Sequence, residues 1–60
     1  MEAMVRMYNI ICIDKITKEW KIIHTVSSKR EAIEWIRVHE SEYPDRILNF
    51  VREGFEPIIE

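Results

Sequence analysis

The fold is decided by residues 28–40, which read Ser28-Lys-Arg-Glu-Ala-Ile-Glu-Trp-Ile-Arg-Val-His-Glu40. This segment has a clear helical period, and strand-like runs lie on both sides of it. Ser28 is followed three residues later by Glu31, which predicts a capping box: the hydroxyl accepts one free N–H and the carboxylate accepts another. Pro44 ends the pattern because its ring disfavours the helical conformation at the residue before it.

Apolar side chains recur every three or four residues along this helix and form one stripe, made of Ala32, Ile36, His39 and Tyr43 with Ile33 and Trp35 at its flanks. Arg30, Glu34 and Arg37 fall on the opposite side, where Arg30 and Glu34 are spaced for a weak i,i+4 pair. Val38 also lies nearly opposite the stripe. Trp35 and Val38 have two interpretations, a core flank beside a lone exposed residue or a ridge that contacts a partner.

Alternating apolar residues predict two strands before the helix, over 4–13 and 19–26, joined by a turn over 14–18. Asp14 favours the start of such a turn, and the hydroxyl of Thr17 can bond to the local backbone. The segment resembles an Asp-x-x-Thr-Gly hairpin loop with Lys18 in place of the glycine. We therefore expect a left-handed Lys18, at a cost of about 1 kcal/mol.

The parity of this loop decides which strand faces match. An odd loop places Tyr8, Ile10 and Cys12 beside Trp20 and Ile22, whereas an even loop brings Ile11 and Ile13 there. We favour the odd loop because a three-residue loop with a left-handed last position is common.

Residues 47–52 predict a third strand, Glu53-Gly54 a turn, and residues 55–59 a short fourth strand. Pro57 confines the fourth strand to a sheet edge or an irregular extension. Residues 1–60 therefore form a single α+β domain of order ββαβ(β). We expect one α-helix packed on one face of a three- to four-stranded antiparallel sheet with strand order 2-1-3-4.

Composition excludes several classes of protein. The chain has 60 residues, a net charge of −2 and one cysteine, so disulfides cannot stabilise it. Cys12 lies in an apolar run and is expected in the core. No apolar run approaches the roughly 18 residues of a membrane span, and the N-terminus lacks the basic flank and apolar core of a signal peptide. We expect a cytoplasmic protein without membrane contact.

Catalytic and metal-binding signatures are missing from the sequence. His24, His39 and Cys12 are not spaced as metal ligands. The single glycine excludes a phosphate-cradling loop, and no serine stands in a nucleophile elbow. The carboxylates near the end of the helix are typical of a solvated rim, since an acid–base pair needs a cleft that separates its pKa values. We expect neither enzymatic activity nor a cofactor.

A nucleic-acid-binding function is the alternative. The span from Tyr8 through Trp35, a hairpin followed by Ser-Lys-x-Glu-Ala-x-x-Trp, is similar to the arm-type DNA-binding domains of phage integrases. That resemblance implies three strands before a helix and a sheet that reads DNA. This chain departs from the pattern, because it has two strands before the helix and its expected outer sheet face carries one lysine, Lys21. Several cations are needed to neutralise phosphates.

The sequence therefore favours a small non-enzymatic interaction or regulatory protein that forms a homodimer. The helix covers one sheet face, and the other face stays apolar where a solvent-facing sheet normally alternates to polar residues. Burial of that face in a second copy would add stability that 60 residues otherwise lack. The candidate interface residues are Ile11, Ile13, Ile23, Thr25 and Val51 on the sheet, with Trp35 and Val38 on the helix.

Overall fold

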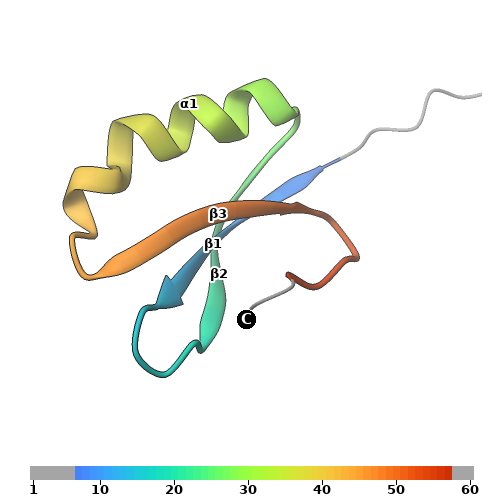
Figure 1. Cartoon of the computed structure of the whole chain (residues 1–60). Coiled ribbons are helices and arrows are strands. Elements are labelled where there is room, and N and C mark those ends of the chain that lie inside the picture. Colours follow the sequence, from blue (N-terminus) through green and yellow to red (C-terminus); the bar gives the residue numbers. More distant parts are fainter. Residues whose placement is uncertain (1–6, 58–60) are drawn as a thin grey trace, which may run out of the picture.

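The computed structural model describes residues 7–57 and contains one helix packed against a three-stranded antiparallel sheet (Figure 1). The predicted α+β arrangement is confirmed. In chain order the elements are β1 (Tyr8–Asp14), β2 (Trp20–Val26), α1 (Lys29–His39), the single-turn 3-10 helix η1 (Glu40–Glu42) and β3 (Arg46–Arg52).

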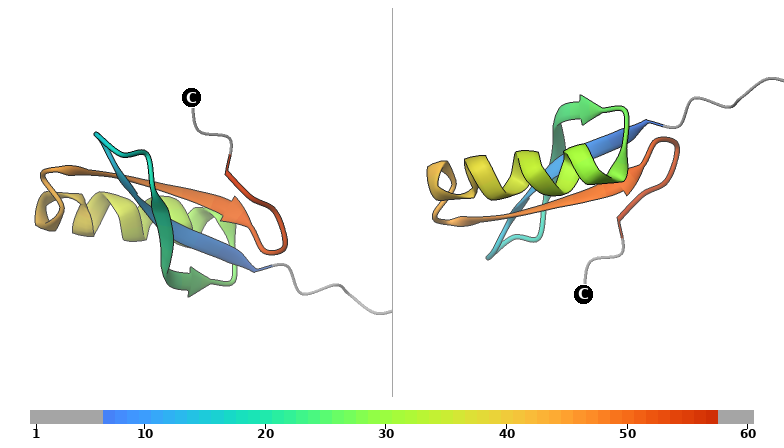
Figure 2. Two further views of the ribbon diagram at one scale, coloured as in Figure 1. Left: turned by 90° about the horizontal axis from the view of Figure 1, so that it is seen from below. Right: turned by 90° about the horizontal axis from the view of Figure 1, so that it is seen from above.

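The central strand is β1, which pairs antiparallel with both β2 and β3 in the order β2-β1-β3. The two outer strands therefore run in the same direction, and α1, which connects them in the chain, lies over one face of the sheet (Figure 2). The buried apolar side chains are four consecutive residues of β1, Ile10 to Ile13, and Ala32 of α1. The core is thus built around the middle of β1.

A fourth strand is not present in the described part of the chain. Residues 55–57 lie in no strand, and residues 58–59 of that prediction lie outside the described residues, as do residues 4–6 of the first predicted strand. After β3 the chain turns through Gly54, whose φ of 90° suits a residue without a side chain. The N–H of Phe55 donates to the Arg52 carbonyl at 3.0 Å and closes this turn.

The start of α1 follows the predicted cap in part. Ser28 has extended backbone angles, and its Oγ accepts from the N–H of Glu31 at 3.1 Å. The Glu31 carboxylate, however, accepts from the backbone N–H of Ser27 at 3.2 Å and from its hydroxyl at 2.9 Å. The reciprocal half of the capping box therefore reaches Ser27, one residue earlier than expected.

The β1–β2 loop contradicts the predicted odd parity. The N–H of Asp14 donates to the Glu19 carbonyl at 2.8 Å, and the N–H of Lys18 donates to the Asp14 carbonyl at 2.9 Å. Four residues therefore separate the opposed Asp14 and Glu19, and Ile13 pairs with Trp20. Lys18 is left-handed as predicted, with φ 68°. In the structure, the left-handed Lys18 is the last residue of a four-residue loop.

A β-bulge in β2 then reverses the parity. Ile11 pairs with Ile22 but Ile10 pairs with His24, so Ile23 is an extra residue without a partner on β1. A bulge of this kind shifts the facing of every later side chain on its strand. The predicted placement of Trp20 and Ile22 beneath the helix is therefore wrong, because both point away from α1.

The left-handed Lys18 generates a stability prediction. Lys18→Gly should raise the free energy of unfolding by up to about 1 kcal/mol, since glycine adopts φ > 0 without steric cost. Urea unfolding followed by circular dichroism measures the change. Lys18→Ala is the matched control, because it also removes the lysine side chain but keeps a Cβ at the one non-glycine position with positive φ in the described chain. A Lys18→Gly protein no more stable than Lys18→Ala would show that the loop carries no strain.

Candidate interaction surface

The side of the sheet that faces away from α1 is the candidate interaction surface, and we call it the outer sheet face. Cross-strand pairing assigns residues to it, because paired residues share a face and successive residues alternate. Its members are Asn9, Ile11 and Ile13 from β1, Trp20, Ile22 and Thr25 from β2, and Ile47, Asn49 and Val51 from β3. The left view of Figure 2 shows this side, with the strands in front of α1.

The outer sheet face contains no charged residue. The charged residues of the three strands all occupy the opposite register: Lys21 pairs with Cys12, Arg46 with Asp14, and Arg52 with Tyr8. A sheet face exposed to water normally carries polar and charged side chains, while the face beneath a helix is apolar. The distribution of charge in this sheet is the reverse of that expectation.

Three large apolar side chains remain exposed on this face. The exposed fractions are 38% for Trp20, 52% for Ile22 and 43% for Ile47. Trp20 and Ile47 flank the buried Ile13 on its two sides through cross-strand pairs. The exposed apolar surface therefore lies over both edge strands, and the centre of the face is already packed.

The predicted interface residues of the sheet differ in their burial and in the face on which they lie. Ile11 and Ile13 lie on the outer sheet face but are buried within the chain, and Val51 is half-buried there. Thr25 is exposed, and its hydroxyl donates to the Asn9 side-chain oxygen at 3.0 Å. Ile23 is half-buried at the bulge.

Trp20 and Ile22 were missed as members of this face. Their strand alternates regularly from Trp20 to Val26, so the sequence carries no signal for the bulge. The even loop that we considered would have placed both residues beside Ile11 and Ile13.

Both edges of the sheet are modified in ways that oppose strand pairing. On β3 the N–H of Phe50 donates to the Asn49 side-chain oxygen at 2.8 Å. The N–H of Glu53 donates to the Met7 carbonyl at 2.8 Å and so points toward β1. Because successive N–H groups of a strand point in opposite directions, the N–H of Phe50 points to the free edge of β3. The free edge of β2 is interrupted by the bulge at Ile23. A partner would meet the face of this sheet more readily than its edges.

Trp35 and Val38 lie together on α1, on the other side of the molecule from the outer sheet face. The Trp35 ring stacks with His24 at a centroid distance of 5.0 Å and with His39 at 3.9 Å. The Nδ1–H of His39 donates to the Trp35 carbonyl at 2.8 Å, since a carbonyl can only accept. The Trp35 ring is therefore half-buried and held between His24 of β2 and His39 of its own helix. Val38 is 67% exposed.

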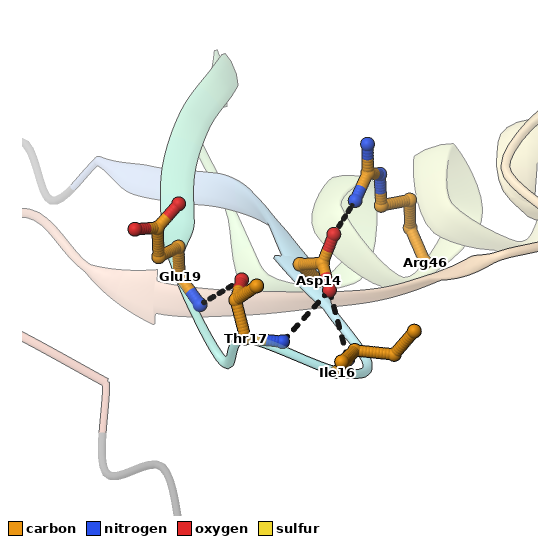
Figure 3. Close-up of polar contacts among 5 residues, drawn as sticks. All are labelled: Asp14, Ile16, Thr17, Glu19 and Arg46. Carbon is orange, nitrogen blue, oxygen red and sulfur yellow. Dashed lines mark hydrogen bonds and ion pairs between the residues drawn. The ribbon is translucent and has the colours of Figure 1, made fainter.

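Polar contacts converge on Asp14 at the hairpin end (Figure 3). Its Oδ1 accepts from the backbone N–H groups of Ile16 at 2.8 Å and Thr17 at 2.9 Å, and its Oδ2 pairs with Arg46. The hydroxyl of Thr17 accepts from the N–H of Glu19 at 3.2 Å, which is the local bond expected of this threonine. These bonds satisfy the turn, and so Asp14 has a structural role.

The pKa of the Asp14 carboxyl lies below its ordinary value of 3.8. The largest cause is the hydrogen bond from the Thr17 N–H, followed by that from Ile16, and Arg46 adds to both. These donors stabilise the charged carboxylate.

A hollow of about 350 Å³ lies beside this group and is lined in part by Cys12, Lys21 and Arg46. Cys12 is a free, buried thiol. Among residues 7–57, no three His, Cys, Asp or Glu side chains are grouped closely enough to hold a metal ion. The described part of the chain also contains no helix with the length and apolar character needed to cross a membrane.

Comparisons of the chain with protein-family models, curated proteins and solved structures give no match.

The hydrogen bonds to Asp14 predict a pH dependence of stability. A lowered folded-state pKa stabilises the fold above the unfolded pKa of about 3.9, and this contribution is lost as the pH falls through the folded value. Asp14→Asn keeps an acceptor oxygen but cannot titrate. Its urea midpoint should therefore fall less between pH 6 and pH 2.5 than that of the wild-type protein. Asp14→Ala, which also lacks the acceptor, should be less stable at both pH values. An equal acid loss in the Asn variant and wild type would contradict this assignment.

Proposed function

We propose that this protein is a small non-enzymatic interaction protein that associates with a second copy of itself through the outer sheet face. The observation that carries the proposal is an uncharged sheet face on which Trp20, Ile22 and Ile47 stay exposed. Exposed apolar surface that is contiguous on one face marks interaction sites in soluble proteins. The free thiol of Cys12 is consistent with a reducing compartment, and we propose the cytoplasm as its location.

A second copy suits this face better than a charged partner does. The chain carries a net charge of −2, so two copies have a weak net repulsion. Contact through a face without charges avoids that repulsion and buries no unpaired ion. A two-fold dimer is the commonest closed arrangement of identical chains, and it brings the same patch together on both sides.

The size of the face sets the strength of this association. Each strand has seven residues, so the face is about 23 Å long and about 14 Å wide, a flat area of about 300 Å². Stable interfaces bury about 800 Å² on each partner. The outer sheet face alone therefore supports a weak dimer, and a tighter one would bury further side chains around it.

The nucleic-acid alternative draws no support from the outer sheet face. Lys21, the lysine expected there, pairs with Cys12 on the opposite side of the sheet. Affinity for phosphates requires several cations on the contacting surface. Heparin chromatography at low salt would detect such binding, and we expect the protein to flow through.

The oligomeric state tests the proposed self-association. Wild-type protein should approach about twice the 7.3 kDa chain mass in light scattering as its concentration rises from micromolar to millimolar. Ile22→Lys and Ile47→Lys should each keep the mass near that of one chain, because a lysine in the contact places like charges face to face. Both side chains are exposed, so circular dichroism should report an intact fold.

Ile16→Lys is the matched control, since Ile16 is 90% exposed at the hairpin tip and lies off the outer sheet face. It introduces the same chemical change and should leave the mass of the dimer unchanged. A wild-type protein that remains a single chain at millimolar concentration would contradict the proposal. So would an Ile16→Lys protein that dissociates as fully as Ile22→Lys.

A further inference from the structure

The outward side of α1 carries two shallow hollows of opposite charge. One, of about 500 Å³, is lined by Lys29, Arg30, Ile33, Glu34 and Arg37, and we call it the basic flank. The other, of about 350 Å³, is lined by Val26, Glu31, Glu34, Trp35, Val38 and His39, and we call it the acidic flank. Three cations and the Glu34 carboxylate surround the first hollow, and Glu31 together with the same Glu34 lies at the second, so cations predominate in one and carboxylates in the other.

Each flank includes an exposed apolar side chain. Ile33 is 46% exposed on the basic flank, and Val38 is 67% exposed on the acidic flank. The two residues are five positions apart, which places them about 140° apart around the helix axis. A second molecule can therefore contact Ile33 without covering Val38, while Glu34 lies between the two flanks and lines both hollows.

The charges on these flanks are not neutralised within the chain. Among residues 7–57 the one ion pair joins Arg46 to Asp14, so the expected pair between Arg30 and Glu34 does not form. Glu31 is held by Ser27 through hydrogen bonds, but those bonds leave its negative charge in place. The cations of one flank and the carboxylates of the other are available to an external partner.

We propose that α1 mediates a head-to-tail contact in which the basic flank of one copy packs against the acidic flank of the next. The occupant of each flank is a second copy of this chain. Ile33 would meet Val38, and the guanidinium groups of Arg30 and Arg37 would meet the carboxylates of the neighbouring helix. The contact uses different residues from the outer sheet face and does not depend on it.

This contact differs from outer-face pairing in symmetry and in salt dependence. A head-to-tail contact joins two different patches, so it extends to further copies unless a ring closes. It also relies on exposed charges, which salt screens as the Debye length falls from about 30 Å at 0.01 M to about 3 Å at 1 M. Pairing through the uncharged outer sheet face lacks that sensitivity.

Sedimentation velocity at about 0.01 M and about 1 M salt tests the inference. At low salt the wild-type protein should form species larger than two chains, and these should be lost at high salt. The species that remains reports the outer sheet face separately: two chains if that proposal holds, and one chain if it fails.

Two variants test whether the contact joins different patches. Arg30→Glu with Arg37→Glu blocks the basic flank, and Val38→Lys blocks the acidic flank. Each protein alone should lose the salt-sensitive species, and an equimolar mixture should regain one contact, since each supplies the flank that the other lacks. Both variants remain net negative, so the mixture does not gain opposite overall charges.

The matched control for the arginine variant is Lys15→Glu with Lys21→Glu, which makes the same change in net charge outside both flanks. It should retain the salt-sensitive species. The inference is overturned if wild-type protein forms no such species, if the mixture shows no salt-sensitive association beyond that of each variant alone, or if the control abolishes the species equally. Should the double arginine variant unfold, Arg37→Glu alone replaces it, because Arg37 is exposed.

Discussion

The β-bulge at Ile23 determines how the side chains of β2 are divided between the two faces of the sheet. In a regular strand Trp20, Ile22, His24 and Val26 would share one face. The extra residue sends the first two outward with Ile13 and Ile11 and the last two inward with Ile10 and Tyr8. Without it, either α1 would lose the His24 ring that stacks on Trp35 or the outer sheet face would lose Trp20 and Ile22.

The length of the helix explains where the charges of the sheet are tolerated. An 11-residue helix is about 16 Å long, whereas seven-residue strands span about 23 Å, so α1 leaves the ends of the inner face uncovered. Asp14 and Arg46 pair at one end, and Arg52 lies over the Phe55 ring at 5.6 Å at the other. Charged residues at those ends keep contact with water or with a partner. The outer sheet face carries no charged residue at either end, and the proposed contact rests on that difference.

Local signals predicted most of the fold. The cap at Ser28 and the stop before Pro44 bound the helix to within a few residues, and alternation located three strands, because these features depend on nearby residues alone. The facing of β2 depends on a loop and a bulge that local signals do not specify. A left-handed Lys18 is compatible with both three- and four-residue loops, so it does not determine the loop length. Ser27 and Ser28 can both bond to Glu31, so the sequence does not determine which serine the carboxylate contacts. The sequence therefore predicted which side of the sheet is uncovered, but it assigned Trp20 and Ile22 of β2 to the wrong side.

The positions of the two surfaces allow both to be occupied at once. Because α1 lies on the opposite side of the sheet from the outer sheet face, two sheets that meet face to face leave both helices on the outside. Neither flank of α1 is covered by that pairing. The burial of Ala32 and the His24–Trp35 stack fix α1 to the sheet, so the two proposed contacts would keep a constant relative orientation. A pair formed through the sheets would present two basic and two acidic flanks, and each further contact would then join pairs rather than single chains.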